Sequence, residues 1–442
     1  MRKSMSRHSQ GKRSVKRNAN NAPVLLLLAL SVLVVPATAI AFPGPPLPIF
    51  NLLPYLSPHL GQPATAVVSS APQNASGGAP DASKGSEKIR FSGSLAGEGR
   101  WRKTGDDASP GATLTTDLYL RMFEIGVEAD FADWASATVL LNSEGIGDSL
   151  HGGDGTVMVD EAHLDISVPH LPFYFVLGKR TQPFGLFETH FVTDPLTQDA
   201  YETQTVGLSA GLKAPLATDL SLTFYKGRVQ ADHLSASGLY DAAAAPVPAV
   251  TVARVDSWIL SGISTPAKDI WTVFAAYSSE PAAGRRMTTL GLGSNLVIPG
   301  LKNLQIDTEY MRALGREDVP GLGRSFRETA VSVTASYQFV LRPRTLRGGG
   351  NYRARKSQRM SHPAEMALRF EAFDDGARAS ALGSWSVKNR ASLGGRYTFF
   401  EKGSFLAALE LEVRKQTVRV SPAFEGTAPA THEVYLRLGL DF

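Results

Sequence analysis

Five titratable side chains lie within a short segment that interrupts an otherwise regular chain. Between Leu177 and Leu212 the sequence reads LGKRTQPFGLFETHFVTDPLTQDAYETQTVGLSAGL, and it carries Arg180, Glu188, His190, Asp194 and Glu202. Charged groups held in a narrow water-filled space would select solutes by size and by electric field. We predict a loop that folds into such a space and narrows it; the alternative interpretation is an ordinary surface loop.

A second group of residues is strongly basic. No acid occurs between Glu328 and Glu365. Arginine suits two-pronged contacts with phosphate and carboxylate groups. The stretch predicts an anion-attracting mouth or ladder, contact with lipopolysaccharide phosphates, or simply a solvated loop. Its basic residues are Arg342, Arg344, Arg347, Arg353, Arg355, Lys356 and Arg359.

The remaining candidates for chemistry are weak. One acidic and histidine-containing run could suggest a metal site, but its later members alternate with Ala162, Leu164 and Ile166, so the polar face of a strand explains them. No serine lies in a recognisable nucleophile setting. The absence of cysteine excludes disulfides, thiolate metal sites and a cysteine nucleophile. We expect no cofactor, no metal and no enzymatic activity. The run comprises His151, Asp154, Asp160, Glu161, His163 and Asp165.

Elements with a period of two residues surround these groups from Lys88 onward. Val331, Val333 and Ala335 alternate with polar residues, and so do Leu409 and Leu411. Successive side chains of a strand point to opposite faces, so each segment has one apolar and one polar face. A soluble β-sandwich would show the same alternation.

Three details favour a barrel in a membrane. Many segments reach nine residues or more, which suits a tilted membrane strand. The polar faces carry carboxylates and arginines, as expected for a wet lumen, and the apolar faces end in aromatic side chains. We predict an all-β transmembrane antiparallel barrel of about sixteen strands, with fourteen or eighteen as alternatives. The aromatic residues are Trp101, Phe131, Trp134, Phe339 and Phe400.

The C-terminal end of the chain reads as an assembly signal. Val434, Leu436, Leu438, Leu440 and Phe442 fall on one face of a final strand. An alternating strand with a terminal aromatic residue resembles the signal that the outer-membrane barrel assembly machinery recognises.

The N-terminal end reads as an export signal. Residues 1–41 combine seven basic residues, an apolar run from Val24 to Val35 and a small-x-small end at Ala39-Ile40-Ala41. Residues 42–87 form a Pro/Ala/Ser-rich periplasmic segment, and residues 88–442 form the barrel. Without the leader the net charge is 45 − 7 − 41 = −3, so the basic pI gives no reason to expect nucleic-acid binding.

The loop segment also resembles a known family. Gly178-Lys179, Pro183-Phe184-Gly185, Phe187-Glu188, Asp194-Pro195-Leu196-Thr197 and Glu202-Thr203 are similar to the pattern of LbtU-type siderophore porins. The resemblance implies an outer-membrane barrel associated with uptake of an iron-chelating siderophore.

These observations predict a porin in the outer membrane of a Gram-negative bacterium, through which small solutes, including a siderophore, diffuse passively. The alternative within transport is a phosphate-selective, anion-selective or general porin. From another class, the barrel could be non-conducting and serve adhesion or envelope anchoring. The expected partners are outer-membrane lipid and lipopolysaccharide, the barrel assembly machinery, a small-molecule solute and two further copies in a homotrimer.

Overall fold

The protein is described from a computed structural model, which covers residues 88–105, 113–148, 155–246, 254–283, 285–301, 303–319, 321–341, 362–424, 426 and 428–442. The predicted leader (residues 1–41), the predicted periplasmic segment (42–87) and the arginine-rich stretch (342–361) lie outside the described residues.

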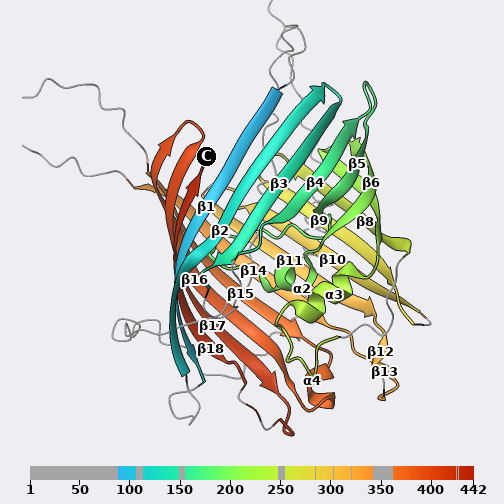
Figure 1. The fold of residues 1–442 in the computed structure, drawn as a ribbon, viewed down its shortest axis with the longest axis vertical. Coiled ribbons are helices and arrows are strands. Elements are labelled where there is room, and N and C mark those ends of the chain that lie inside the picture. Colours follow the sequence, from blue (N-terminus) through green and yellow to red (C-terminus); the bar gives the residue numbers. More distant parts are fainter. Residues whose placement is uncertain are drawn as a thin grey trace, which may run out of the picture. The chain divides into compact units, whose positions relative to one another are not determined.

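Within the described part, sixteen antiparallel strands close into one barrel (Figure 1). They are 9 to 20 residues long, which fits strands that cross a bilayer at a tilt. The strands are β1 (Lys88–Thr104), β2 (Thr113–Ala132), β3 (Ala135–Ile146), β4 (Met158–Ser167), β5 (Phe173–Thr181), β6 (Gln204–Ala214), β7 (Thr218–Lys226), β8 (Val255–Ala267), β9 (Trp271–Pro281), β10 (Arg286–Val297), β11 (Leu304–Gly315), β14 (Thr329–Leu341), β15 (His362–Asp374), β16 (Trp385–Lys402), β17 (Phe405–Val420) and β18 (Thr431–Asp441).

Each barrel strand pairs with its neighbour in sequence, and β18 closes the ring on β1. The closing register runs from Ser94 opposite Asp441 to Thr104 opposite Thr431. Closure leaves no unpaired strand edge, which is the condition for a sheet to exist in lipid. The prediction of a sixteen-stranded antiparallel barrel is confirmed.

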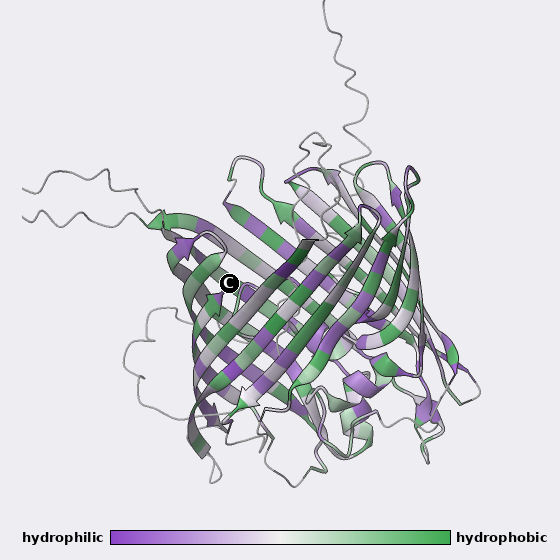
Figure 2. Ribbon diagram, turned by 45° about the horizontal axis from the view of Figure 1, so that its top comes forward, coloured by the Kyte–Doolittle hydropathy of each residue, from purple (hydrophilic) through white to green (hydrophobic). Residues whose placement is uncertain are grey.

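The alternation of side chains is the reverse of that in a soluble protein. On β17, Leu411 is 49% exposed while Glu412 is fully buried, and on β18 Leu438 is exposed while Arg437 is buried. Figure 2 shows the same alternation of hydrophobic and hydrophilic residues along the strands. Apolar groups outside and charged groups inside suit a wall between lipid and an aqueous lumen.

The two rims of the barrel differ in their connections. The rim that holds Phe442 has short turns, such as those between β2 and β3 and between β16 and β17. The opposite rim has the longer connections, including those after β5 and β7. The arginine-rich stretch joins Leu341 to His362, and these residues pair at the rim with the short turns.

Short helices and one small hairpin accompany the wall. The helices are α2 (Leu196–Tyr201), α3 (Val229–Ala236) and α4 (Arg378–Ala381), and β12 (Asp318–Val319) pairs with β13 (Arg324–Ser325). Figure 1 shows α2 and α3 inside the outline of the wall. In the described residues, no helix has both the length and the apolar character that a membrane span requires.

An apolar core lies between these helices and one side of the barrel. It is formed by the loops that carry α2 and α3 and by the inner faces of strands from β7 to β16. Phe184, Leu196 and Tyr201 come from the loop after β5, whereas Leu234 and Tyr240 come from the loop after β7. None of its members lies on β1 to β6, β17 or β18, so the lumen is filled unevenly.

Candidate functional site: a loop fastened across the lumen

The segment from Gln182 to Thr203 leaves β5, crosses the lumen and returns to β6. It touches β15, which is eight strands away from β5 around the ring in either direction, so the loop reaches the opposite wall. Residues 191–201 of the loop are buried. The predicted inward fold of this segment is confirmed, and the question becomes what holds it there.

Glu309 of β11 binds the loop at three points. Its Oε1 accepts hydrogen bonds from the backbone N–H groups of Leu186 (2.7 Å) and Phe187 (2.9 Å), and its Oε2 accepts one from the hydroxyl of Thr197 (2.6 Å). Hydrogen bonds to a charged group contribute about 1.5–3 kcal/mol each. A single buried carboxylate therefore fixes both the first turn of the loop and α2.

His190 fastens the tip of the loop to two strands. Its Nε2 lies 2.7 Å from Asp307 of β11, and its Nδ1 contacts Glu365 of β15. Burial disfavours the charged imidazolium, but the hydrogen bonds and charges of the two carboxylates outweigh it and raise the pKa of His190 to about 10. At neutral pH His190 is therefore a cation held between two anions.

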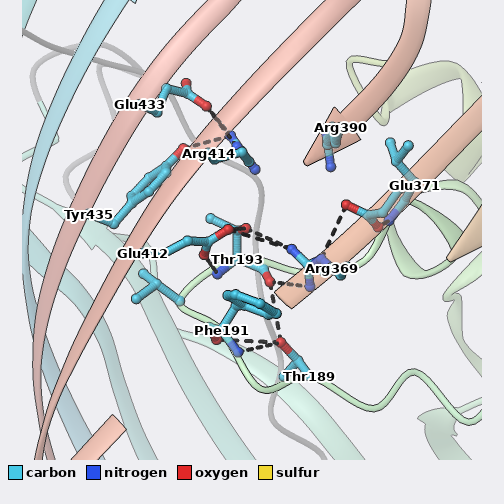
Figure 3. A network of polar contacts seen from close by, with 12 residues as sticks. Thr189, Phe191, Thr193, Arg369, Glu371, Arg390, Glu412, Arg414, Glu433 and Tyr435 are labelled. Atoms are coloured by element: carbon cyan, nitrogen blue, oxygen red, sulfur yellow. Dashed lines mark hydrogen bonds and ion pairs between the residues drawn. The ribbon is translucent and has the colours of Figure 1, made fainter. Parts of the chain in front are cut away.

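Thr193 is enclosed by charged side chains of β15 and β17 (Figure 3). Its backbone N–H and its hydroxyl both donate to Glu412, at 2.8 Å each. Arg369 donates to the carbonyl oxygen of Thr193 at 2.9 Å and stacks on the ring of Phe191. Glu371 accepts a hydrogen bond from the N–H of Leu196 at 2.5 Å, which gives a partner to a backbone N–H that has none within α2.

Two further arginines complete the attachment. Arg437 of β18 donates to the carbonyl oxygen of Val192, and Arg390 of β16 pairs with Asp199 of α2. The loop is thus bound to β11, β15, β16, β17 and β18. A connected network of buried hydrogen bonds and ion pairs in a low-dielectric interior holds the loop in one position.

The wall beside the loop carries a band of arginines that are paired with acids. Arg437 binds Glu98 at 3.0 Å, and Arg414 binds Glu433 at 2.5 Å and the hydroxyl of Tyr435 at 2.6 Å. The other inward arginines of this band are Arg100, Arg102 and Arg121 on β1 and β2. The lumen is therefore densely charged on the side that the apolar core leaves free.

The structure places the predicted residues in different environments. Glu188 is exposed at the loop tip, within electrostatic reach of Asp307 and Glu365, and His190 is paired as described. Arg180 is part of β5, not of the loop, because the strand continues to Thr181; its guanidinium donates to Ser209 of β6. The structure thus brings Glu188 and His190 together and sets Arg180 apart from them.

The two remaining loop acids differ in burial. Asp194 is completely buried, and neither carboxylate oxygen has a hydrogen-bond partner in the described part of the chain. Burial and the charges of Asp199 and Glu202 raise its pKa well above the ordinary value. Burial also raises the pKa of Glu202 to about 7, with the charges of Asp160 and Asp199 acting in the same direction. Asp194 is out of reach of a solute, whereas Glu202 is partly accessible.

Of the two other predicted groups, the structure describes only the one on β4. Arg342, Arg344, Arg347, Arg353 and Arg355 lie outside the described residues. On β4, His163 lies 3.1 Å from Asp165 and 3.8 Å from Glu161, so these three share one face of the strand, as the alternation predicts.

The residues that hold the loop were not singled out from the sequence. Glu371 and Glu412 lie far along the chain from the segment they bind. Asp307 and Glu309 carried a signal, because they alternate with apolar neighbours and so had to face the lumen. The alternation of residues does not predict which acid on the lumen face forms a hydrogen bond with which atom of the loop.

Comparison with protein-family models and with curated sequences gives no match. Solved structures do match. The outer membrane channel DcaP of Acinetobacter baumannii has a TM-score of 0.54 and 11% identity over 81% of this chain and 99% of that one. Salmonella typhi OmpF, solved with daunomycin, has a TM-score of 0.52 and 12% identity over 80% and 98% of the two chains. The anion-selective porin from Comamonas acidovorans has a TM-score of 0.50 and 10% identity over 81% and 100%. At this identity the likeness shows that the chain has the porin barrel fold.

Proposed function

We propose that the protein is a porin in the outer membrane of a Gram-negative bacterium, through which small solutes diffuse passively. The observation that carries the proposal is the loop Gln182–Thr203, which crosses the lumen and is fastened to the opposite wall by Asp307, Glu309, Glu371 and Glu412. A loop held in this way narrows the lumen, and no separate plug domain is needed. It sets a fixed limit on solute size.

The uneven filling of the lumen supports a path on one side. The apolar core occupies the side from β7 to β16. Charged residues line the side formed by β1 to β5, β17 and β18, among them Arg100, Arg121 and Arg437. Water and ions follow charged surfaces in preference to apolar ones, so the path runs along the charged side.

Both signs of charge occur along this path. Arginines on β1, β2 and β15 to β18 are paired with acids such as Glu98 and Glu433, and further acids lie on β3, on β4 and at the end of the loop. Charged groups of both signs around a narrow passage create a local electric field. We propose that this field orders water and favours dipolar or charged solutes of limited size.

Uptake experiments test the general proposal and its finer forms. Liposomes that contain the refolded barrel should swell in sugars up to a size limit and not beyond it. The resemblance in the loop supports a siderophore as solute, and loss of siderophore uptake in a deletion strain would agree with it. If uptake is unchanged and phosphate flux falls, the anion-selective alternative holds.

Other classes of function have less support. A non-conducting barrel for adhesion or anchoring needs no loop fastened across its lumen, and a barrel enzyme needs an activated nucleophile, which the site described above does not contain. Liposomes that fail to swell although the barrel is inserted would favour anchoring.

We also propose partners that fit a porin. Phe442 serves the barrel assembly machinery, the apolar outer faces contact lipid and lipopolysaccharide, and three copies form a homotrimer. Mass measurement of the protein extracted in mild detergent tests the trimer directly.

A further inference from the structure

A group of oxygen atoms lacks donors at the place where the loop leaves the wall. We name as the oxygen cluster Asn142 of β3, Asp160 of β4, Gln182 at the start of the loop and Glu202 at its end. The oxygens Asn142 Oδ1, Asp160 Oδ2 and Gln182 Oε1 are buried and have no hydrogen-bond partner among the described residues.

Strand pairing brings these residues together. Thr181 pairs with Gln204, and the N–H of Gln182 donates to the carbonyl oxygen of Thr203 at 2.8 Å, so Glu202 lies beside Gln182. The N–H of Thr181 lies 3.5 Å from the carboxylate of Glu161, which directly follows Asp160. Asp160 and Glu202 are close enough to act on each other electrostatically.

A bulge turns Asp160 inward. On β4, Glu161, His163 and Asp165 face the lumen, so strict alternation would point Asp160 at lipid. The register shifts here: Leu140 pairs with Glu161 and Leu141 with Val159, which leaves Asp160 as the extra residue. Asp160 is accordingly 7% exposed, while Val159 beside it is 46% exposed. The irregularity adds a carboxylate to the lumen side that a regular strand would not supply.

The two amides present their oxygens to the cluster, because their nitrogens are engaged elsewhere. Gln182 Nε2 donates to the carbonyl oxygens of Arg180 (2.9 Å) and Thr205 (3.0 Å). Asn142 Nδ2 donates to Glu144 at 2.9 Å. Because hydrogen bonds hold each amide nitrogen in place, the amide group cannot flip and the position of its oxygen is fixed.

In the described part of the chain, neither Asp160 nor Glu202 has an ion-pair partner within 4.0 Å. The nearby Arg121 pairs with Glu144 at 3.3 Å, and Arg180 donates to Ser209. Glu202 accepts one hydrogen bond, from Nε2 of Gln198 at 2.7 Å. One water molecule could donate only two hydrogen bonds and would leave the charge of buried Asp160 uncompensated.

We propose that the oxygen cluster binds one calcium ion, which fastens the start and the end of the lumen loop to β3 and β4. Calcium accepts six to eight oxygen ligands of mixed type, including amides and hydroxyls, in flexible geometry, whereas magnesium demands a regular octahedron. Among the described residues no three acidic or histidine side chains converge to form a metal site by themselves. The amides of Asn142 and Gln182 therefore contribute to the ligand set around Asp160 and Glu202, and water molecules complete it.

The test uses full-length mature protein refolded in detergent, free of lipopolysaccharide, so that calcium bound to lipid phosphates does not contribute. After treatment with chelator, radioactive calcium is titrated by equilibrium dialysis, with magnesium as competitor. We expect one calcium ion per chain, with a Kd of about 0.1–1 mM or tighter, and a higher thermal midpoint in calcium. Absence of calcium binding to the folded wild type would overturn the proposal.

Variants locate the ion. Asp160→Asn should weaken calcium binding at least about tenfold, and Asn142→Leu, which removes one neutral oxygen at nearly constant volume, should weaken it severalfold. The matched control is Asp165→Asn, on the lumen face of the same strand, which should bind like the wild type. Wild-type affinity in both Asp160→Asn and Asn142→Leu would place the ion elsewhere and refute the assignment. If the protein does not bind calcium here, the proposed channel function still stands, because liposome swelling and conductance do not require calcium.

Discussion

Phe442 and Gly93 close the barrel as a pair. The N–H of each donates to the carbonyl oxygen of the other at 3.0 Å, and the ring of Phe442 lies where a side chain at position 93 would stand. A Cβ on Gly93 would be 2.4 Å from Cζ of the phenylalanine and 2.8 Å from the backbone oxygen of Glu124. The ring of the C-terminal phenylalanine thus packs against the first strand of the barrel.

Substitution of Gly93 should weaken this closure. Gly93→Ala forces the Phe442 ring or the β2 backbone to shift, at a cost of about 1–3 kcal/mol. The temperature at which half of the protein loses its folded band in gel electrophoresis should therefore fall. Gly97→Ala, on the same strand, places its Cβ in open space and should not lower it. Equal unfolding temperatures for the two variants would contradict the proposed packing of Phe442 against Gly93.

Removal of the Glu309 carboxylate should free the loop. In Glu309→Ala the N–H groups of Leu186 and Phe187 and the hydroxyl of Thr197 lose their acceptor, and each unsatisfied group costs about 1–3 kcal/mol. We expect faster proteolysis within residues 182–203 and larger, noisier conductance. Asp219→Ala, which removes a lumen-side acid of β7 bonded to Lys213 and Tyr174 and not to the loop, is the control. Unchanged proteolysis in Glu309→Ala would show that the loop is held by other contacts.

His190 should make stability depend on pH in the alkaline range. Its pKa is raised from 6.5 to about 10, so its contribution is complete below pH 6.5 and is lost as the pH rises towards 10. The thermal midpoint of the wild type should therefore fall more between pH 7 and pH 10 than that of His190→Gln. Parallel curves for the two proteins would mean that the imidazolium does not stabilise the fold.

Glu202 should make ion selectivity depend on pH near neutrality. Because its pKa is raised to about 7, it gains its negative charge as the pH rises through 7. The preference for cations, read from the reversal potential in a salt gradient with chelator present, should increase over this range. Glu202→Gln should show a flatter dependence, and an unchanged slope would exclude Glu202 as the titrating group.

The sequence predicts the fold well because the signal is local. Alternation within one strand, as at Leu409 to Val413, needs no knowledge of any other strand. The segment from Leu177 to Leu212 contains the whole loop, but it also includes the last residues of β5. Arg180, which the sequence analysis assigns to the loop, therefore belongs to the wall.

The sequence does not predict the contacts of the loop because those depend on register around the whole barrel. Thr193 and Glu412 are separated by 219 residues, and each intervening strand pair contributes its own offset. Bulges such as the one at Asp160 change which face of the strand a residue occupies. Errors in assigning side chains to the lumen face or the lipid face therefore accumulate along the chain. The arginines on the lumen wall follow from alternation, but their pairing with particular acids does not.

Single-channel recording in planar bilayers tests the central claim that solutes pass beside the fastened loop. The refolded protein, shown to be folded by its gel shift on heating and inserted by flotation with lipid, should give discrete conductance steps of uniform size. Folded and inserted protein that gives no conductance would contradict the account.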